Sequence, residues 1–163
     1  MDEKFLLHPD RIAAKAQVFA GVFVPDDFER LGDMLADARG ELRYQVSAAL
    51  DRQRRKVVSC IIEGFVFLMC QKSLEAFRHE VTVHDRLVLV DDEAALPSID
   101  EESDTEDHVV ADEPLDIRDL VEDAVLLSLP MVPCKPGLES ADAGKAAARG
   151  ESPFAALASL KRK

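Results

Sequence analysis

The sequence predicts an α+β fold, either an antiparallel β-meander or a partly closed barrel, with two packed helices and a short C-terminal helix. Two observations lead to this class: four segments have the alternating or apolar pattern of strands, and two have the apolar spacing of amphipathic helices. The 163 residues, 47% of them hydrophobic and 6% aromatic, suffice for one domain with an aliphatic core. We expect this domain over residues 1–133, followed by a linker and a short basic helix over residues 134–163.

The four predicted strands follow one another with short connections. Residues 18–24 are β-branched and aromatic, and residues 41–50 alternate apolar with polar side chains. Residues 57–70 form a long apolar run in which Gly64 indicates a bulge or a bend, and residues 77–90 return as the next strand. Consecutive strands with tight turns favour antiparallel pairing.

Helices are predicted over residues 25–38 and 116–129. In both segments apolar side chains recur at spacings of three and four, which places them on one face. Gly40 follows the first segment and Pro130 follows the second, and both residues stop helices.

The net charge of −12 comes from one part of the chain. Residues 91–113 hold eleven acids and no Lys or Arg, whereas residues 39–90 carry nine bases and six acids. We therefore predict that residues 91–113 form a mobile acidic loop that interrupts the domain. The folded body is then free to approach an anionic partner.

Two groups of cations are candidates for contacts with RNA phosphates, each of which adds affinity that falls with salt. One group crowds the turn between two predicted strands and the other ends the chain. The candidates are Arg52, Arg54, Arg55, Lys56, Lys161, Arg162 and Lys163. A solvated turn is the alternative for the first group, and the spacing alone does not separate the two interpretations.

The acidic segment supplies candidates for binding a basic protein, because dense carboxylates create a strong local negative potential. These candidates are Asp100, Glu101, Glu102, Asp104, Glu106 and Asp107. A spacer that keeps RNA away from one face of the protein is the alternative interpretation.

No catalytic residue, metal or cofactor is predicted. The histidines accompany no nucleophile in a distinctive setting, and no phosphate-binding loop is complete. The three cysteines are too far apart for a secreted disulfide scaffold, which favours a cytoplasmic protein. Cys70 and Cys134 are the candidate metal ligands, but Ser73 stands where a second thiolate would complete a zinc-binding pair. Free thiols are therefore expected, with a degenerate zinc-ribbon enzyme or a redox protein as the alternative.

Several segments together carry a family resemblance. They are residues 9–15, 21–31, 70–77, 116–133 and, most specifically, the ending Pro-Phe-Ala-Ala-Leu-Ala-Ser-Leu-Lys-Arg-Lys at 153–163. In these segments the chain resembles the bacterial YceD family, the large ribosomal RNA subunit accumulation proteins. It departs from the zinc-like form of that family, because Ser73 replaces a cysteine and the later cysteine cluster is reduced to Cys134.

The resemblance implies a non-enzymatic role in the synthesis, processing or stability of 23S ribosomal RNA, and hence in ribosome biogenesis. The first hypothesis is a factor that contacts precursor ribosomal RNA through the cationic candidates. The alternative is an acidic holdase for a small basic large-subunit ribosomal protein, without direct RNA contact. Both mechanisms can operate together.

Overall fold

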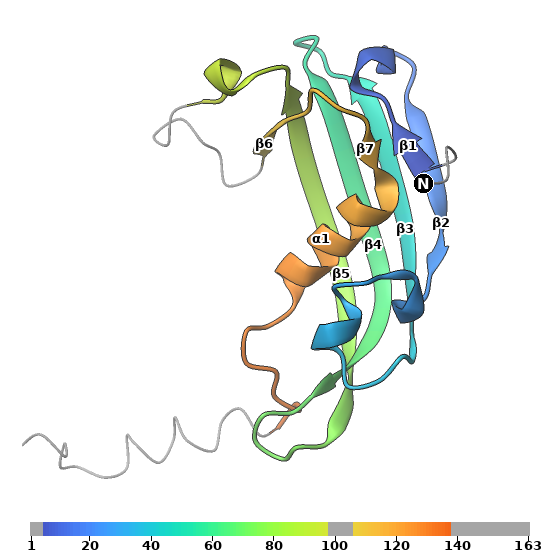
Figure 1. Cartoon of the computed structure of the whole chain (residues 1–163), viewed down its shortest axis with the longest axis vertical. Helices are drawn as coiled ribbons and strands as arrows, with labels where there is room; N and C mark the ends of the chain where they lie inside the picture. The colour runs from blue at the N-terminus through green and yellow to red at the C-terminus, as the bar shows by residue number, and fades with distance from the viewer. Residues whose placement is uncertain (1–4, 98–105, 138–163) are drawn as a thin grey trace, which may run out of the picture.

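The computed structural model describes residues 5–97 and 106–137, which form a curved, open β-sheet with one face covered (Figure 1). The five strands of this sheet lie in the order β2-β3-β4-β5-β6. Their bounds are β2 Gln17–Phe23, β3 Gly40–Leu50, β4 Lys56–Met69, β5 Ala76–Val90 and β6 Asp107–Val110. A two-stranded pair, β1 Leu6–Leu7 with β7 Leu115–Asp116, precedes the only α-helix of the described residues, α1 Ile117–Ser128.

Strands β2 to β5 form an antiparallel meander, in which β2 pairs with β3, β3 with β4 and β4 with β5. They coincide within a few residues with the strands predicted from the alternating and apolar patterns. The register is continuous through Gly64, which lies opposite Leu42, so no bulge occurs there. A Cβ atom at Gly64 would overlap the carbonyl oxygen of Glu41, so glycine is needed for the close approach of β3 and β4.

The core lies between the sheet and α1, which crosses one face of the sheet in Figure 1. Alternate residues of β3, such as Leu42 and Val46, point into this layer and are fully buried. From α1, Ile117, Val121 and Val125 are fully buried against them. Burial of each such side chain stabilises the fold by about 1.5–3 kcal/mol.

The helix predicted over residues 116–129 is confirmed as α1. Asp116 caps it, because its Oδ1 accepts the amide of Arg118 at 2.8 Å. The helix ends before Pro130, as the position of that proline predicts.

The prediction of a helix over residues 25–38 is wrong. Two short 3-10 turns, Pro25–Asp27 and Gly32–Met34, stand there instead. The amides of Arg30 and Leu31 donate to Oε1 of Glu122 on α1, at 2.7 and 2.8 Å. A carboxylate from a distant helix thus takes the donors that a local helix would have satisfied within itself.

The predicted fold class is therefore wrong. The described residues contain one α-helix where two packed helices were expected, and 45% of them lie in strands. Within the described residues the sheet does not close into a barrel, because β2 and β6 each pair with a single neighbour. The predicted C-terminal helix lies outside the described residues.

Strand β6 lies inside the segment predicted to be an acidic loop. It runs parallel to β5 and places Val109 beside Leu89. Four residues are too few for a local strand signal, and only the pairing with β5 defines them as a strand. Residues 98–105 of the same segment lie outside the described residues.

Candidate nucleic-acid interface

The turn that was predicted to contact RNA joins β3 to β4 at one end of the sheet. Asp51 organises it, because its Oδ1 accepts the amides of Gln53 and Arg55 at 2.8 and 2.9 Å. The Asp51 carbonyl accepts the amide of Arg54, whose φ of 64° is in the left-handed region. The side chains of Arg52 and Arg54 consequently lie exposed at the tip.

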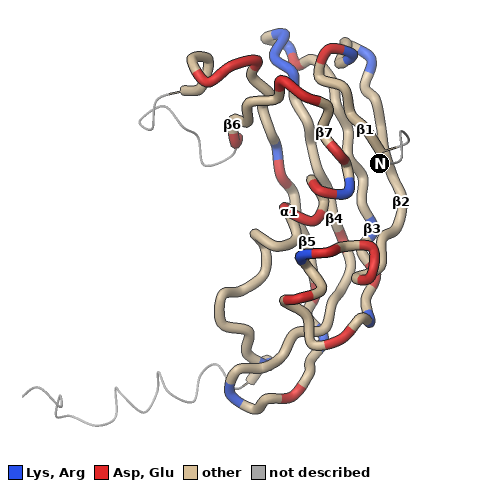
Figure 2. Tube along the Cα trace, in the orientation of Figure 1, with Lys and Arg blue, Asp and Glu red and all other residues tan. Residues whose placement is uncertain are grey.

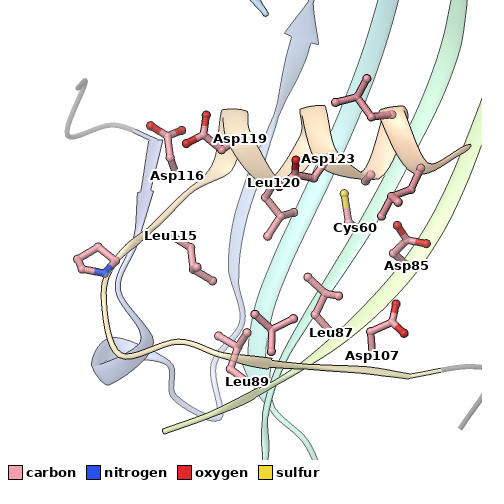
Figure 3. A pocket seen from close by; sticks show the side chains of 15 residues that line it. Cys60, Asp85, Leu87, Leu89, Asp107, Leu115, Asp116, Asp119, Leu120 and Asp123 are labelled. Atoms are coloured by element: carbon pink, nitrogen blue, oxygen red, sulfur yellow. The ribbon is translucent and has the colours of Figure 1, made fainter. Parts of the chain in front are cut away.

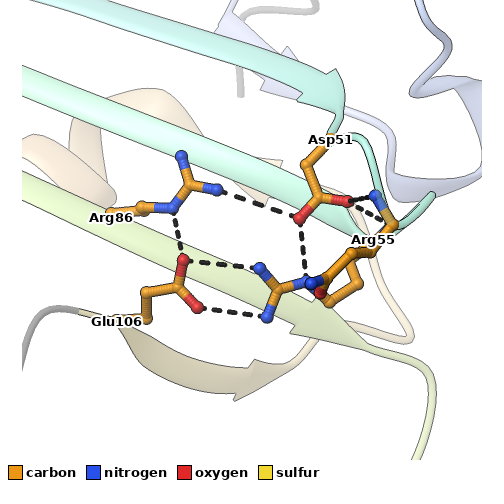
Figure 4. A network of polar contacts seen from close by, with 5 residues as sticks. Asp51, Arg55, Arg86 and Glu106 are labelled. Carbon is orange, nitrogen blue, oxygen red and sulfur yellow. Dashed lines mark hydrogen bonds and ion pairs between the residues drawn. The ribbon is translucent and has the colours of Figure 1, made fainter. Parts of the chain in front are cut away.

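Arg55 belongs instead to a network of two arginines and two carboxylates (Figure 4). Its Nε donates to Asp51 at 2.8 Å and its Nη1 to Glu106 at 3.1 Å, while Arg86 Nε donates to Glu106 at 2.7 Å. Hydrogen bonds from Arg86 and Arg55 lower the pKa of Glu106 below its usual range. The four charges of the network sum to zero, so Arg55 adds no net positive charge to the surface.

Lys56 is also paired, with Nζ 2.5 Å from Oδ1 of Asp91. Asp91 and Glu106 both come from the segment whose carboxylates were expected to stay apart from the cationic turn. That expected separation of charge is wrong here, because the pairing of β6 with β5 brings Glu106 beside Arg86.

The structure adds two cations that the sequence analysis missed. The Leu50 amide donates to the Ala13 carbonyl at 3.1 Å, so the segment before β2 lies beside the start of the turn. This segment carries Arg11 and Lys15, both exposed. Figure 2 shows the cations of both segments at the same end of the molecule.

We call Arg11, Lys15, Arg52 and Arg54 the basic end. None of the four has an ion-pair partner among the described residues, although Asp10 lies in the same region. The contacts that join Arg11 and Lys15 to the turn are between distant segments, so no local pattern could have indicated them.

A hollow of about 360 Å³ adjoins the basic end and is lined in part by Arg54, Lys56 and His108. The Nδ1 atom of His108 is buried and has no hydrogen-bond partner within the described part of the chain. Arg54, Arg55 and Lys56 are the cations that line this hollow, and Asp91, the ion-pair partner of Lys56, is the carboxylate among its lining residues.

The other predicted site residues lie elsewhere. Lys161, Arg162, Lys163, Asp100, Glu101, Glu102 and Asp104 are outside the described residues. Asp107 begins β6, on the strand face opposite to Glu106.

The two candidate metal ligands lie close together at the far end of the sheet. The buried sulfur of Cys70 accepts the amides of Ser73 and Lys135 at 3.5 and 3.3 Å, and Cys134 directly precedes Lys135. Hydrogen bonds from the Ser73 hydroxyl and from these amides lower the pKa of Cys70 to about 6. In contrast, burial raises the pKa of Cys60 to about 12.

This cluster is a poor fit to structural zinc, which takes four thiolate or imidazole ligands. The described residues contain no group of three or more His, Cys, Asp or Glu side chains placed to hold a metal ion. Backbone amides and Ser73 surround the Cys70 sulfur instead and stabilise its negative charge.

The thiol of Cys70 is expected to titrate near pH 6, and Ser73→Ala is expected to move its pKa upward. The thiolate form is stabilised by folding, so its contribution to stability is full above the ordinary thiol pKa. That contribution is lost as the pH falls through 6. Ultraviolet thiolate absorbance across a pH series measures the midpoint, with Cys134→Ser as the control. A midpoint near the ordinary thiol value in the unmodified protein would contradict this prediction.

The comparisons place the chain among ribosome-biogenesis factors. The family model for the large ribosomal RNA subunit accumulation protein YceD matches residues 58–161, so the chain belongs to this family. Membership implies a role in accumulation of large-subunit ribosomal RNA, and the family is not a known enzyme family. No solved structure gives a match to the chain. Within the described residues, no helix has the length and apolar character needed to cross a membrane.

Proposed function

We propose that this protein supports the accumulation of 23S ribosomal RNA without catalysis, in the bacterial cytoplasm, by contacting phosphates of the RNA or its precursor at the basic end. The observation that carries the proposal is the exposure of Arg11, Lys15, Arg52 and Arg54 without carboxylate partners among the described residues. Unpaired cations can neutralise phosphates without first breaking an internal ion pair, so their contacts cost less than contacts from Arg55 or Lys56.

The arrangement of these cations also suits a backbone contact more than base recognition. They come from two segments at one end of the sheet, and no aromatic residue lies among them. Binding of this kind depends on phosphate charge and on salt, and carries little sequence information. The C-terminal Lys161, Arg162 and Lys163 would add to the same interaction.

The double variant Arg52→Gln/Arg54→Gln is expected to bind transcripts of 23S ribosomal RNA about tenfold more weakly at moderate salt. Losing two phosphate contacts should also reduce the slope of log affinity against log salt by roughly 1.4–1.8. Filter binding across a salt series measures both quantities. The matched control is Arg39→Gln/Arg43→Gln, which removes the same charge from arginines already paired with Asp37 and Glu41.

The control variant is expected to bind as the unmodified protein does. Equal losses in both variants would show that net charge alone matters, and unchanged binding by Arg52→Gln/Arg54→Gln would exclude the basic end. In cells, the same variant should lower the ratio of 23S to 16S ribosomal RNA.

A second function, protection of a small basic large-subunit ribosomal protein, requires an acidic surface on the folded part of the chain. Such a surface is present along α1, where Asp119 and Asp123 face a groove. This function does not compete with the first, because the groove and the basic end use different residues.

A further inference from the structure

A groove of about 680 Å³ lies between α1 and strands β5 and β6 (Figure 3). Its floor is apolar: Leu87 and Leu89 rise from β5, Val109 from β6, and Leu120 and Leu126 from α1. The α1 residues that line the groove run from Asp119 to Leu127, along most of a helix that at 12 residues is about 18 Å long.

Five aspartates surround this apolar floor. Asp85 and Asp107 lie on β5 and β6, Asp116 caps the start of α1, and Asp119 and Asp123 lie on the helix, as Figure 3 shows. No Lys, Arg or His is among the described residues that line the groove. One carboxylate, Asp123, is paired, at 2.7 Å from Arg30, and the other four have no ion-pair partner within the described residues.

The carboxylates repel one another as well. Burial and the nearby charge of Asp107 raise the pKa of Asp85, and His84 offsets this only in part. A cation entering the groove would relieve this repulsion, because it would stand within reach of both strands' carboxylates.

Among the described residues, exposed apolar side chains continue from the groove past the end of α1. Leu127, which lines the groove, is 86% exposed, and Met131 and Val132 just after the helix are 100% and 65% exposed. A run of exposed large apolar side chains beside an apolar groove is typical of an interaction surface.

We propose that this groove binds a basic amphipathic helix of a partner protein. An apolar stripe on that helix would lie on the leucines and Val109, while Lys or Arg side chains on both flanks would meet the two rows of aspartates. The choice of a basic ribosomal protein as the source of this helix rests on the second function proposed above. The chemistry of the groove does not depend on that choice.

The test uses the full chain and a synthetic helical peptide of roughly four turns, with leucines on one face and lysines on the other. Asp107→Lys/Asp119→Lys is expected to weaken binding about tenfold or more, measured by calorimetry, because two attractive charges become repulsive. Both aspartates are exposed, so the fold should tolerate the change. A peptide of the same composition in scrambled order should bind several-fold more weakly.

The matched control is Asp26→Lys/Glu63→Lys, the same change of charge at two exposed acids outside the groove. Its affinity for the peptide is expected to stay within about twofold of that of the unmodified protein, because the two changed charges act on the groove only at long range. Leu127→Ser tests the apolar part and should weaken binding about threefold to tenfold. Equal weakening by both charge variants would overturn the proposal.

Two other occupants of the groove, the chain's own C-terminal segment and a second copy of the chain, would give different results. If reversing Lys161, Arg162 and Lys163 to Glu tightens peptide binding, the chain's own C-terminal segment fills the groove and the proposal is overturned. A dimeric mass by light scattering that Leu127→Ser abolishes would assign the groove to a second copy, which also overturns it.

Failure of this inference can be separated from failure of the proposed functions. Arg52→Gln/Arg54→Gln leaves the groove unchanged, so binding of 23S ribosomal RNA by that variant tests the basic end alone, whereas the groove is tested by Asp107→Lys/Asp119→Lys. Binding of a basic ribosomal protein that survives this variant would retain the second function and reject the groove as its site.

Discussion

Gly64→Ala is expected to lower the free energy of unfolding by about 3 kcal/mol, which corresponds to a fall of roughly 10 °C in melting temperature. The new Cβ would overlap the carbonyl oxygen of Glu41 and lie 3.0 Å from the Cα of Leu42. Both neighbours are backbone atoms in the middle of the β3–β4 pairing, so neither can move aside without breaking ladder hydrogen bonds. Urea unfolding followed by circular dichroism measures the change.

Gly32→Ala is the matched control for Gly64→Ala. No atom of the described residues lies within 4 Å of a Cβ at Gly32, which stands in an exposed turn. We expect a change within about 0.5 kcal/mol. If the two alanine variants have the same stability, the close approach of β3 and β4 at Gly64 is not the determining feature.

Glu122→Ala is expected to cost about 2–4 kcal/mol of stability. Glu122 is 4% exposed and accepts hydrogen bonds from the amides of Arg30 and Leu31 and from the Arg30 guanidinium. Removing the carboxylate leaves the buried Leu31 amide without a partner and releases the segment between β2 and β3 from α1. Glu122→Gln keeps one acceptor oxygen and should cost about half as much.

The control for Glu122 is Asp123→Asn, which removes the neighbouring partner of Arg30. That ion pair is more than half exposed on both sides, so its loss should cost less than about 1 kcal/mol. A larger loss in Asp123→Asn than in Glu122→Ala would contradict the assignment of Glu122 as the anchor of this segment.

Stability should also depend on pH through Glu122. Burial acts to raise the pKa of this carboxyl, but hydrogen bonds from Leu31 and Arg30 outweigh it and hold the pKa below the ordinary value of 4.5. The ionised form is therefore favoured by folding, and its contribution is present above pH 4.5 and is lost as the pH falls below it. Glu122→Gln should show a smaller loss of stability over the same acid range.

The long strands could be predicted because their signal is local. In β3, Leu42, Tyr44, Val46 and Ala48 alternate with polar residues, and this pattern alone determines which face is buried. The helix α1 was predictable for the same reason, since its apolar stripe and Pro130 lie within one segment.

The structure of residues 25–38 could not be predicted from the local pattern. The helical spacing of the apolar residues favours a helix, but a hydrogen bond to a residue 91 positions away favours another conformation. Glu122 accepts a hydrogen bond from the amide of Leu31, and this tertiary contact outweighs the local helix propensity. Strand β6 was missed for a related reason, since its four residues become a strand only beside β5.

In the candidate sites, too, local features could be predicted and contacts between distant segments could not. The cationic turn was visible as a cluster in the sequence, but the pairing of Arg55 and Lys56 with distant carboxylates was not. The groove had no sequence signal at all, since Asp85, Asp107 and Asp119 lie on three separate elements.

The pairing of β1 with β7 delays completion of the fold until late in the synthesis of the chain. Leu6 pairs with Asp116, so the first strand has no partner until the ribosome has made most of the domain. From Val90 to Ser128 translation lasts on the order of a few seconds, during which the apolar face of β3 to β5 has no helix over it. For that interval the nascent sheet is prone to aggregate, and its yield in cells should depend on chaperones at the exit tunnel.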